Sequence, residues 1–413
     1  MPLLLYGARQ VGKTHSIQAF GAEHYRNVAY FNLETNQAIS SYFSENIDPV
    51  HILRFLETES REQIVPGETL VVFDEIQSCP RALTALKYFN ETAPDYHVIG
   101  AGSLLGVAVN KESFSFPVGN VDSLTLFPLD FEEFLWALGE ERLCEDIRTS
   151  FDSNKALPHA LHTKALDLYR QYLIIGGMPR AVLEYLETGS LLTVPDVQNK
   201  IMNDYVADMA KYADHGESVK IRAAYNSIPA QLAKDNKKFQ YKLAAKGGTA
   251  NIFGTAIEWL EFAGVVLKCQ KVEQGLLPLA AYGDPSSFKL YMGDVGLLVM
   301  KSGLPQHVVL AVGTMDNTFL GAISENYVAQ ALRNNHHALY YWATNGIAEL
   351  DFVLQKDSGI VPVEVKTGTR TRSRSLHIFS EKYRPAYSIR ISVKNFGFEH
   401  NIQSVPLYAV FCV

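Results

Sequence analysis

The sequence predicts an α/β protein with more than one domain. At 413 residues the chain is longer than one average domain, and 47% of its residues are hydrophobic, enough for several cores. In the first third, short apolar runs alternate with helical stretches, a pattern typical of a parallel sheet covered by helices. In the last third, apolar strands that carry acidic residues follow a helix. We therefore expect two α/β domains separated by a mainly helical region.

Composition narrows the class of protein. No apolar run reaches the roughly 18 to 20 residues that a membrane span needs, and residues 1–6 lack the charged segment that starts a secretory signal. The net charge of -7 argues against an overall basic surface, although it leaves room for local basic patches. The cysteines form no C-x-x-C pair and are expected to be core residues rather than zinc ligands or disulfides. We expect a cytoplasmic protein.

The first motif lies between an apolar run at residues 2–6 and a helical stretch at residues 15–20. It reads Gly7-Ala8-Arg9-Gln10-Val11-Gly12-Lys13-Thr14, the G-x-x-x-x-G-K-T pattern of a P-loop. Its glycines would let backbone N–H groups face phosphates, while Lys13 would reach the β and γ phosphates and the Thr14 hydroxyl would hold Mg²⁺. Strand, loop and helix in this order predict that all eight residues bind ATP.

The apolar run at residues 69–73 ends in a second element of the same site, Asp74-Glu75. An uninterrupted apolar run is typical of a strand buried on both faces, and acids at its carboxyl end would lie in the ligand crevice of an open α/β sheet. We expect Asp74 to hold Mg²⁺ through water, and Glu75 to polarise the attacking water, with Glu75 and Lys13 as catalytic residues. The alternative is a pair of solvated acids after a core strand.

Further apolar runs complete a predicted parallel sheet of about five strands; these runs are residues 28–33, 96–99 and 121–127. Ser103 follows the run at residues 96–99. It is a candidate for sensing the γ-phosphate, and it is equally well explained as a small polar residue in a turn.

Four motifs together resemble a prokaryotic family of ATPases. Its members join an AAA-type P-loop module to a carboxyl-terminal domain of unknown function, and the resemblance covers nearly the whole chain. Besides the P-loop, the motifs are Phe73-Asp74-Glu75-Ile76-Gln77, Leu126-Phe-Pro-Leu-Asp-Phe-Glu-Glu-Phe134 and Tyr172-Leu-Ile-Ile-Gly-Gly-Met-Pro179. The resemblance implies an ATP hydrolase that uses Mg²⁺.

Two departures from the family bear on activity. Relatives usually carry an arginine after the glycine that corresponds to Gly119, where this chain has Asn120. If that arginine stabilises transition-state charge, its loss implies slow turnover, because an arginine finger can contribute about 10³-fold or more. Relatives also have a segment before the first strand that helps to cover the base, so we expect an amino-terminal truncation with an incomplete adenine pocket.

The middle of the chain is predicted to be mainly helical. A helical pattern over residues 131–192, broken at Gly176-Gly177-Met178-Pro179, predicts a lid that completes an ATPase domain of residues 1–192 with its core at 1–130. Arg180, after the break, could reach a phosphate or be an ordinary surface arginine. Helices at residues 220–233, 241–245 and 249–263, with strands at 265–272 and 276–281, predict a winged-helix-like domain over residues 193–281.

A local basic patch lies in this middle domain. It predicts contact with the DNA backbone, or else lysines that solvate a linker, and we hold the two alternatives equal. The aromatic residues Phe239 and Tyr241 lie among its lysines, which are Lys234, Lys237, Lys238, Lys242 and Lys246.

In the last predicted domain, residues 282–413, a hairpin at residues 349–366 carries acidic residues on both strands. Alternate residues of a strand share a face, so Glu349 groups with Asp351, and Glu364 groups with Lys366. The turn between the strands would be Asp357-Ser358-Gly359. Any half-exposed hairpin shows this alternation, so the hairpin alone does not indicate chemistry.

The helix that precedes the hairpin favours a chemical role for these acidic residues. Its apolar residues Ala322, Ala329 and Leu332 stand three, four and seven positions from Glu325, which places that carboxylate in the apolar stripe. A buried-side glutamate followed by Asp351, Glu364 and Lys366 resembles the PD-(D/E)xK nucleases, with Leu350 in place of the usual proline.

The resemblance to these nucleases implies a restriction-endonuclease-like fold and a second Mg²⁺ site. Asp351 and Glu364 would hold the metal, Glu325 would complete or orient the metal shell, and Lys366 would be catalytic, positioning water or stabilising charge on the phosphate. Strands at residues 387–393 and 406–413 would extend the sheet. A basic strip opposed only by Glu381 suits a phosphodiester backbone and comprises Lys366, Arg370, Arg372, Arg374, Lys382 and Arg384.

The sequence thus predicts a Mg²⁺-dependent P-loop ATPase of AAA type whose nucleotide state gates a nuclease-like module on DNA. Cutting and mere binding are equally open, because the same residues can persist in a module that only recognises its ligand. The alternative function is a signalling or assembly switch, in which the nucleotide controls a protein partner and no phosphodiester is cut. The sequence does not indicate the oligomeric state or the pathway.

Overall fold

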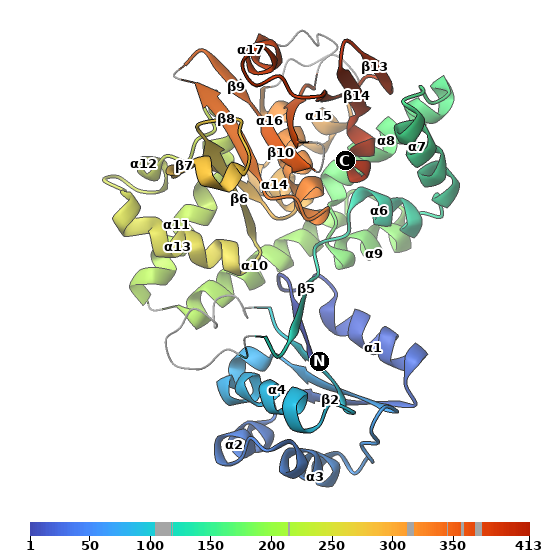
Figure 1. The fold of residues 1–413 in the computed structure, drawn as a ribbon, viewed down its shortest axis with the longest axis vertical. Coiled ribbons are helices and arrows are strands. Elements are labelled where there is room, and N and C mark those ends of the chain that lie inside the picture. Colours follow the sequence, from blue (N-terminus) through green and yellow to red (C-terminus); the bar gives the residue numbers. More distant parts are fainter. Residues whose placement is uncertain are drawn as a thin grey trace. The chain divides into compact units, whose positions relative to one another are not determined.

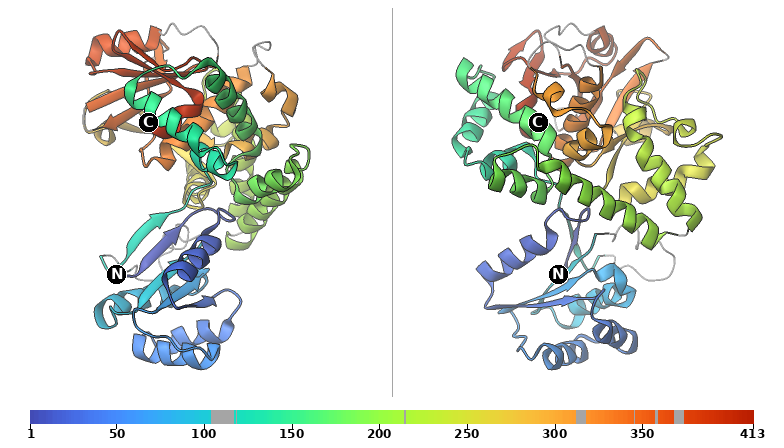
Figure 2. Two further views of the ribbon diagram at one scale, coloured as in Figure 1. Left: turned by 90° about the vertical axis from the view of Figure 1, so that its right-hand side faces the viewer. Right: turned by 180° about the vertical axis from the view of Figure 1, so that it is seen from behind.

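The computed structural model describes residues 1–103, 117, 119–213, 215–311, 318–344, 346–356, 359–367 and 374–413. The chain divides into two compact units. The first consists of Met1–Phe127 with Phe262–Gly264, and the second of Pro128–Glu261 with Val265–Val413. Figures 1 and 2 show both units as ribbons. Compactness alone does not test the expected boundaries at residues 192 and 281, which stay predictions.

The first unit is built on a parallel sheet of five strands in the order β2-β3-β4-β1-β5. The strands are β1 (Leu3–Tyr6), β2 (Asn27–Asn32), β3 (Thr69–Asp74), β4 (His97–Ala101) and β5 (Asp122–Thr125). This confirms the predicted parallel sheet of about five strands. Parallel order places the carboxyl ends of β1, β3 and β4, where the P-loop, Asp74 and Ser103 follow, at one edge of the sheet.

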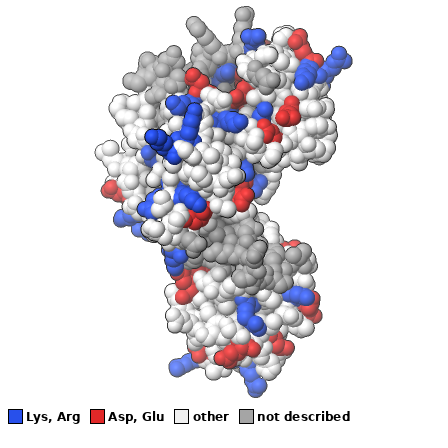
Figure 3. Space-filling view, turned by 90° about the vertical axis from the view of Figure 1, so that its left-hand side faces the viewer, with Lys and Arg blue, Asp and Glu red and all other residues white. Residues whose placement is uncertain are grey.

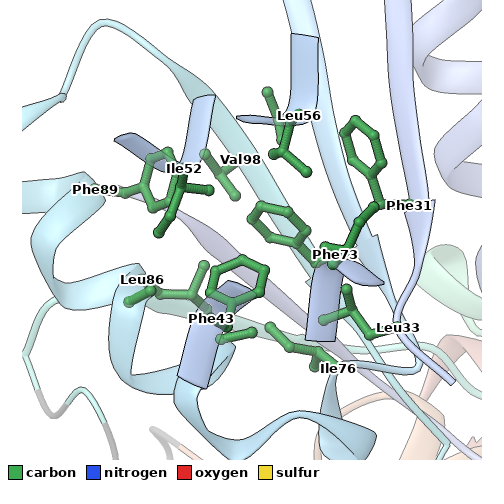
Figure 4. Packing of buried hydrophobic residues seen from close by; sticks show 14 of the residues in the cluster. Phe31, Leu33, Phe43, Ile52, Leu56, Phe73, Ile76, Leu86, Phe89 and Val98 are labelled. Atoms are coloured by element: carbon green, nitrogen blue, oxygen red, sulfur yellow. The ribbon is translucent and has the colours of Figure 1, made fainter. Parts of the chain in front are cut away.

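Helices cover both faces of this sheet (Figures 1 and 2). They are α1 (Lys13–His24), α2 (Gln37–Glu45), α3 (Pro49–Ser60) and α4 (Pro80–Thr92), with a short 3₁₀ helix η1 (Ile76–Ser78) after β3. On one face, Ile17 of α1 packs with Leu5, Leu70 and Val72. On the other face, Phe73 packs edge-on against Phe43 of α2, with ring centroids 5.4 Å apart (Figure 4). Burial on both faces is why β3 has no polar interruption before Asp74.

The second unit begins with helices. They are α6 (Phe131–Ala137), α7 (Glu141–Ser153), α8 (His159–Ile175), α9 (Pro179–Thr188), α10 (Val194–Tyr212), α11 (His215–Leu232), α12 (Tyr241–Ala244) and α13 (Ala250–Phe262). The helical pattern over residues 131–192 and the three middle helices are confirmed. Hydrogen bonds tie α8 to the carboxyl-terminal part: Tyr169 donates to Ser324 at 3.2 Å, and Gln330 donates to Tyr172 at 3.0 Å. The role of residues 131–192 as a lid stays a prediction.

Two sheets follow in the second unit. The order β7-β6-β8-β9 describes the first, which comprises β6 (Val266–Val272), β7 (Gly283–Met292), β8 (Tyr340–Thr344) and β9 (Ala348–Leu350). The second has the order β10-β11-β12-β14-β13 and comprises β10 (Phe352–Lys356), β11 (Gly359–Val365), β12 (Ser388–Ser392), β13 (Gly397–Glu399) and β14 (Ile402–Pro406). The remaining elements are α14 (Val295–Ser302), α15 (Gln306–Leu310), α16 (Thr318–Asn334), α17 (Arg374–Tyr383), η2 (Leu279–Tyr282) and η3 (Leu407–Cys412).

Two predicted strands are wrong. Residues 276–281 were expected to be a strand, but Leu279–Tyr282 forms η2, and β6 pairs with β7. Pro278 explains this, because proline has no N–H for a strand ladder. Residues 406–413 were expected to be a strand, but the strand ends at Pro406 and Leu407–Cys412 forms η3. Its apolar residues are buried, and a short buried apolar run looks alike in a strand and a helix.

The predictions for the cysteines and for the carboxyl-terminal hairpin can be compared with the structure. Cys79, Cys144 and Cys269 are buried and free, whereas Cys412 is only partly buried. The hairpin is confirmed by antiparallel pairing of β10 with β11, although Asp357 and Ser358 of its turn lie outside the described residues. Among the described residues, no helix is both long and apolar enough to cross a membrane. The winged-helix-like and restriction-endonuclease-like folds stay predictions.

Candidate functional site

The P-loop has the backbone of a tight phosphate cradle. Gly7 has φ 143° and Gly12 has φ 100°, values that side-chain-bearing residues rarely adopt. A Cβ atom on Gly7 would lie 2.3 Å from the carbonyl oxygen of Leu126, so no larger residue fits there. Gly12 directly precedes α1, whose first N–H groups carry the positive end of the helix dipole. The loop is therefore shaped to receive an anion.

The ammonium of Lys13 lies inside this loop. Its Nζ donates to the carbonyl oxygens of Gly7 and Ala8, each at 2.9 Å, and the residue is only 7% exposed. Burial lowers the pKa of Lys13 to about 8, although the carboxylates of Glu75 and Asp74 act in the opposite direction. The loop thus holds a buried cation that a phosphate could draw away from the carbonyl groups.

Three side chains meet at the end of β3. The Thr14 hydroxyl donates to Oδ2 of Asp74 at 2.8 Å, and the Tyr30 hydroxyl donates to the same oxygen at 2.6 Å. Burial and, to a smaller extent, the hydrogen bond to Asp74 together raise the pKa of Tyr30 to about 12. A hydroxyl and a carboxylate side by side form the oxygen donor set that Mg²⁺ prefers, so Thr14 and Asp74 fit this metal.

Glu75 follows Asp74 in an unusual backbone conformation. Its φ of 50° is left-handed, a region that costs a non-glycine residue about 1 kcal/mol or more. Its Oε2 accepts a hydrogen bond from Nε2 of Gln77 at 2.5 Å, and its backbone N–H donates to Oδ1 of Asp74 at 2.9 Å. The backbone turn and the hydrogen bond from Gln77 therefore fix the orientation of the Glu75 side chain.

The other predicted nucleotide-binding residues lie at the same edge of the sheet. Ala8 and Val11 are buried in the loop, Arg9 is exposed, and Gln10 has φ 65°. Ser103 is buried two residues after β4, the strand between β1 and β3. This position fits either role predicted for it. Their contact with a nucleotide stays a prediction.

The second unit contains an acidic cluster, made of Glu325, Glu349, Asp351 and Glu364. Glu325 lies on α16 and is 2% exposed, among the fully buried Ala322, Ala329 and Leu332, as its place in the apolar stripe predicted. Glu349 is in β9, Asp351 lies between β9 and β10, and Glu364 is in β11.

Lysines neutralise most of this cluster. Nζ of Lys289 lies 3.0 Å from Oε1 of Glu325 and 2.6 Å from Oε1 of Glu349, while Lys237 pairs with Oε2 of Glu325. Burial opposes charge on Glu325, but Lys289 and Lys237 outweigh it and lower the pKa of that carboxyl. Lys366 pairs with Oε1 of Glu364 at 2.8 Å.

Asp351 is the acid in this cluster without a lysine at hydrogen-bond distance among the described contacts. Its Oδ2 accepts from the N–H of Val365 at 2.8 Å. Burial raises the pKa of Asp351, and the neighbouring Glu325 carboxylate raises it further. Among the described residues, no group of three or more His, Cys, Asp or Glu side chains is arranged to hold a metal ion. The predicted metal role of Glu325, Asp351 and Glu364 therefore stays untested.

The predicted basic surfaces are only partly available to a ligand. Lys237 is tied to Glu325, and Phe239 is 4% exposed and stacked on Phe288, so neither can face DNA as it stands. Lys234, Lys242 and Lys246 are exposed. In the carboxyl-terminal strip, Arg374, Lys382 and Arg384 are exposed, whereas Arg370 and Arg372 lie outside the described residues. Figure 3 shows basic side chains gathered on one face of the second unit, with acidic ones among them.

Sequence reasoning missed four residues that complete these sites: Tyr30, Gln77, Lys289 and Tyr291. One signal was present for Lys289, because it is the single charged residue in the apolar run Phe288-Lys289-Leu290-Tyr291-Met292. A lone charge in an apolar run needs a buried partner. Tyr30 and Gln77 have no comparable signal, since their role depends on which side chain lies beside them.

Family models match three parts of the chain. Residues 1–135 match the model described as AAA domain. Residues 166–308 match a domain of unknown function (DUF8612), and residues 320–410 match another domain of unknown function (DUF4143). No curated protein matches the chain.

Several solved structures are similar to the chain. The Walker-type ATPase PABY2304 of Pyrococcus abyssi is 16% identical, with 73% of this chain and 90% of that chain covered and a TM-score of 0.43. The ORC1 protein of Aeropyrum pernix, in complex with DNA, is 15% identical, with 75% and 88% covered and a TM-score of 0.30. AMPPCP-bound DnaA from Aquifex aeolicus is 14% identical, with 63% and 81% covered and a TM-score of 0.29. The AAA-domain match, with the P-loop in its parallel sheet, supports an AAA-type P-loop ATPase in the amino-terminal part of the chain.

Proposed function

We propose that the first unit hydrolyses ATP with Mg²⁺, and that its nucleotide state gates a restriction-endonuclease-like module in the carboxyl-terminal part, which acts on or binds DNA. The observation that carries the ATPase proposal is the meeting of Thr14 and Asp74 at 2.8 Å beside the buried Lys13. Residues of three elements, the P-loop, α1 and β3, converge there in the arrangement that phosphoryl transfer requires.

Each residue of the site has a defined task. The ammonium of Lys13 exchanges the carbonyl oxygens of Gly7 and Ala8 for phosphate oxygens, with the backbone N–H groups of the loop beside it. Thr14 and Asp74 would hold Mg²⁺, which would offset the charge that develops on the phosphates. Glu75, fixed by its turn and by Gln77, orients the attacking water and accepts its proton.

ATP hydrolysis tests the first part of the proposal. The wild-type chain should release phosphate from ATP only with Mg²⁺, and Lys13→Ala should lose both nucleotide binding and phosphate release. Lys87→Ala is the matched control, because Lys87 is an exposed residue of α4 that forms an ion pair with Glu91. Equal phosphate release by wild type and Lys13→Ala would refute the proposal.

DNA binding is supported by exposed basic residues rather than by base-reading geometry. Lys234, Lys242, Arg374 and Arg384 are exposed and could contact phosphates. Phosphate contacts release counterions, so the affinity for duplex DNA should fall steeply as salt is raised. The double variant Lys242→Ala, Lys246→Ala should bind more weakly with a smaller salt slope, and nucleotide should change the affinity of the wild type.

A nucleotide-controlled switch with a protein partner is the second candidate. It is favoured by one observation at the centre of the expected DNA patch. Lys237 forms an ion pair with Glu325, and Phe239 stacks on Phe288, so neither side chain is free to contact DNA. Absence of salt-sensitive DNA binding in a chain that hydrolyses ATP would favour the switch over the DNA-binding module.

A further inference from the structure

Lys289 is a buried cation in the middle of an apolar strand. It is 1% exposed, pairs across the sheet with Cys269 of β6, and has Phe288 and Leu290 as buried neighbours. An ammonium group in such a place is strongly destabilising unless carboxylates surround it. Its position therefore depends on the acids that face it.

Carboxylates from two different elements supply that compensation. The ammonium contacts Oε1 of Glu325 from α16 at 3.0 Å and Oε1 of Glu349 from β9 at 2.6 Å. It also lies 4.8 Å from the centroid of the Tyr341 ring, whose face favours a cation. Lys289 thus lies where two acidic side chains meet, a position in which its positive charge is compensated.

Glu325 has little capacity left for a metal ion. Its Oε1 accepts from Lys289 and, at 2.5 Å, from the hydroxyl of Tyr291, while Oε2 accepts from Lys237. A Mg²⁺ ion binds its oxygen ligands at about 2.0–2.1 Å and in octahedral geometry, so it would have to displace these donors. Lys237 and Lys289 would then each lose the Glu325 carboxylate, and the buried Lys289 would keep Glu349.

The rest of the acidic cluster is matched in the same way. Glu364 pairs with Lys366, so Lys237, Lys289 and Lys366 offset Glu325, Glu349 and Glu364 one for one. Oδ2 of Asp351 accepts a hydrogen bond from the N–H of Val365. In the described part of the chain, Oε2 of Glu364 is buried without a hydrogen-bond partner, and no group of three or more acidic side chains is arranged to hold a metal ion.

We propose that the ammonium of Lys289 fills the carboxylate pocket of the carboxyl-terminal module in place of a divalent metal ion, so that the module binds DNA without cutting it. This inference rests on the proposed function. It decides between the two activities predicted for the module, cutting DNA and binding DNA without cutting, in favour of binding. It also assigns Glu325 to holding Lys237 and Lys289 rather than to holding a metal.

Metal binding by the whole chain tests this inference. Free Mn²⁺ is measured by electron paramagnetic resonance, without nucleotide, in wild type, Asp351→Asn and Lys289→Met, up to about millimolar Mn²⁺. Wild type and Asp351→Asn should bind equal amounts. Lys289→Met should bind more, and the gain should disappear in the double variant Lys289→Met, Asp351→Asn.

Three results would overturn the proposal: Mn²⁺ bound by wild type and lost in Asp351→Asn, no gain in Lys289→Met, or cleavage of plasmid DNA by wild type with Mg²⁺ or Mn²⁺. If Lys289→Met does not fold, the proposal is still tested by the comparison of wild type with Asp351→Asn and by the cleavage assay. Phosphate release from ATP is measured on the same samples. Its absence in the wild type would count against the proposed ATPase, whatever the Mn²⁺ results.

Discussion

The Thr14 hydroxyl donates a hydrogen bond of 2.8 Å to Asp74, a residue 60 positions later in the chain. Helix α1 carries the first residue and strand β3 ends in the second, so the parallel sheet brings together two motifs that the sequence keeps apart. Thr14→Ala should weaken binding of Mg²⁺-ATP by about tenfold or more, because the hydroxyl that would bind Mg²⁺ and its hydrogen bond to Asp74 are both lost. Binding of a fluorescent ATP analogue with and without Mg²⁺ measures this. Thr14→Ser keeps the hydroxyl and should stay close to wild type.

Tyr30 holds the same oxygen of Asp74 from strand β2. Tyr30→Phe removes this donor and leaves the ring, so we expect kcat for ATP to fall several-fold while KM changes little. Tyr25→Phe is the control, because the Tyr25 hydroxyl contacts His97 and not Asp74. Identical steady-state kinetics for Tyr30→Phe and wild type would show that Tyr30 does not position Asp74.

Gln77 positions Glu75 through its side-chain amide. Gln77→Ala should lower kcat by about tenfold and leave nucleotide affinity unchanged, since Glu75 loses the group that fixes its carboxylate. Gln18→Ala changes an exposed residue of α1 and should have no effect. A rise in the dissociation constant for ATP without a fall in kcat would contradict this role.

The pKa of Lys13 predicts how ATP binding depends on pH. Because burial lowers that pKa to about 8, the lysine is charged below pH 8 and loses its proton above it. Phosphate needs the charged form, so ATP affinity should be constant below this pH and fall by up to about tenfold per pH unit above it. Calorimetric titrations across about two units on either side measure the profile. Lys13→Arg stays charged, so its profile should be flat; a flat wild-type profile would contradict the prediction.

The break at Gly176-Gly177 predicts a large effect on stability. A Cβ atom on Gly177 would lie 1.9 Å from the carbonyl oxygen of Leu129, and the Gly177 N–H donates to Asp294 at 2.6 Å in the buried interior. Gly177→Ala should therefore lower the free energy of unfolding of this unit by several kcal/mol, measured by urea denaturation. Gly216→Ala, in α11 with open space around it, should be neutral or stabilising by up to about 1 kcal/mol. Equal stability of the two variants would contradict this account.

The sequence predicted those features that depend on local pattern. The P-loop, the uninterrupted strand before Asp74 and the buried place of Glu325 each follow from spacing along a strand or helix. The pairing of β6 with β7 could not be predicted in the same way, because the next apolar run after β6, residues 276–281, is interrupted by Pro278 and forms no strand. Nor could the ion pairs of Glu325, since Lys237 and Lys289 are 88 and 36 residues away from it in the chain. Such contacts depend on the tertiary fold rather than on local pattern.

Replacement of Glu75 by glutamine tests the central claim most directly, because the amide keeps the size of the side chain and removes its ability to accept a proton. Binding of ATP and release of phosphate are measured on the same preparations of wild type and Glu75→Gln. We predict that Glu75→Gln binds Mg²⁺-ATP as tightly as wild type and that phosphate release falls by about 10²-fold or more. Phosphate release at the wild-type rate in Glu75→Gln would contradict the proposal that the first unit is an ATPase with Glu75 as its base.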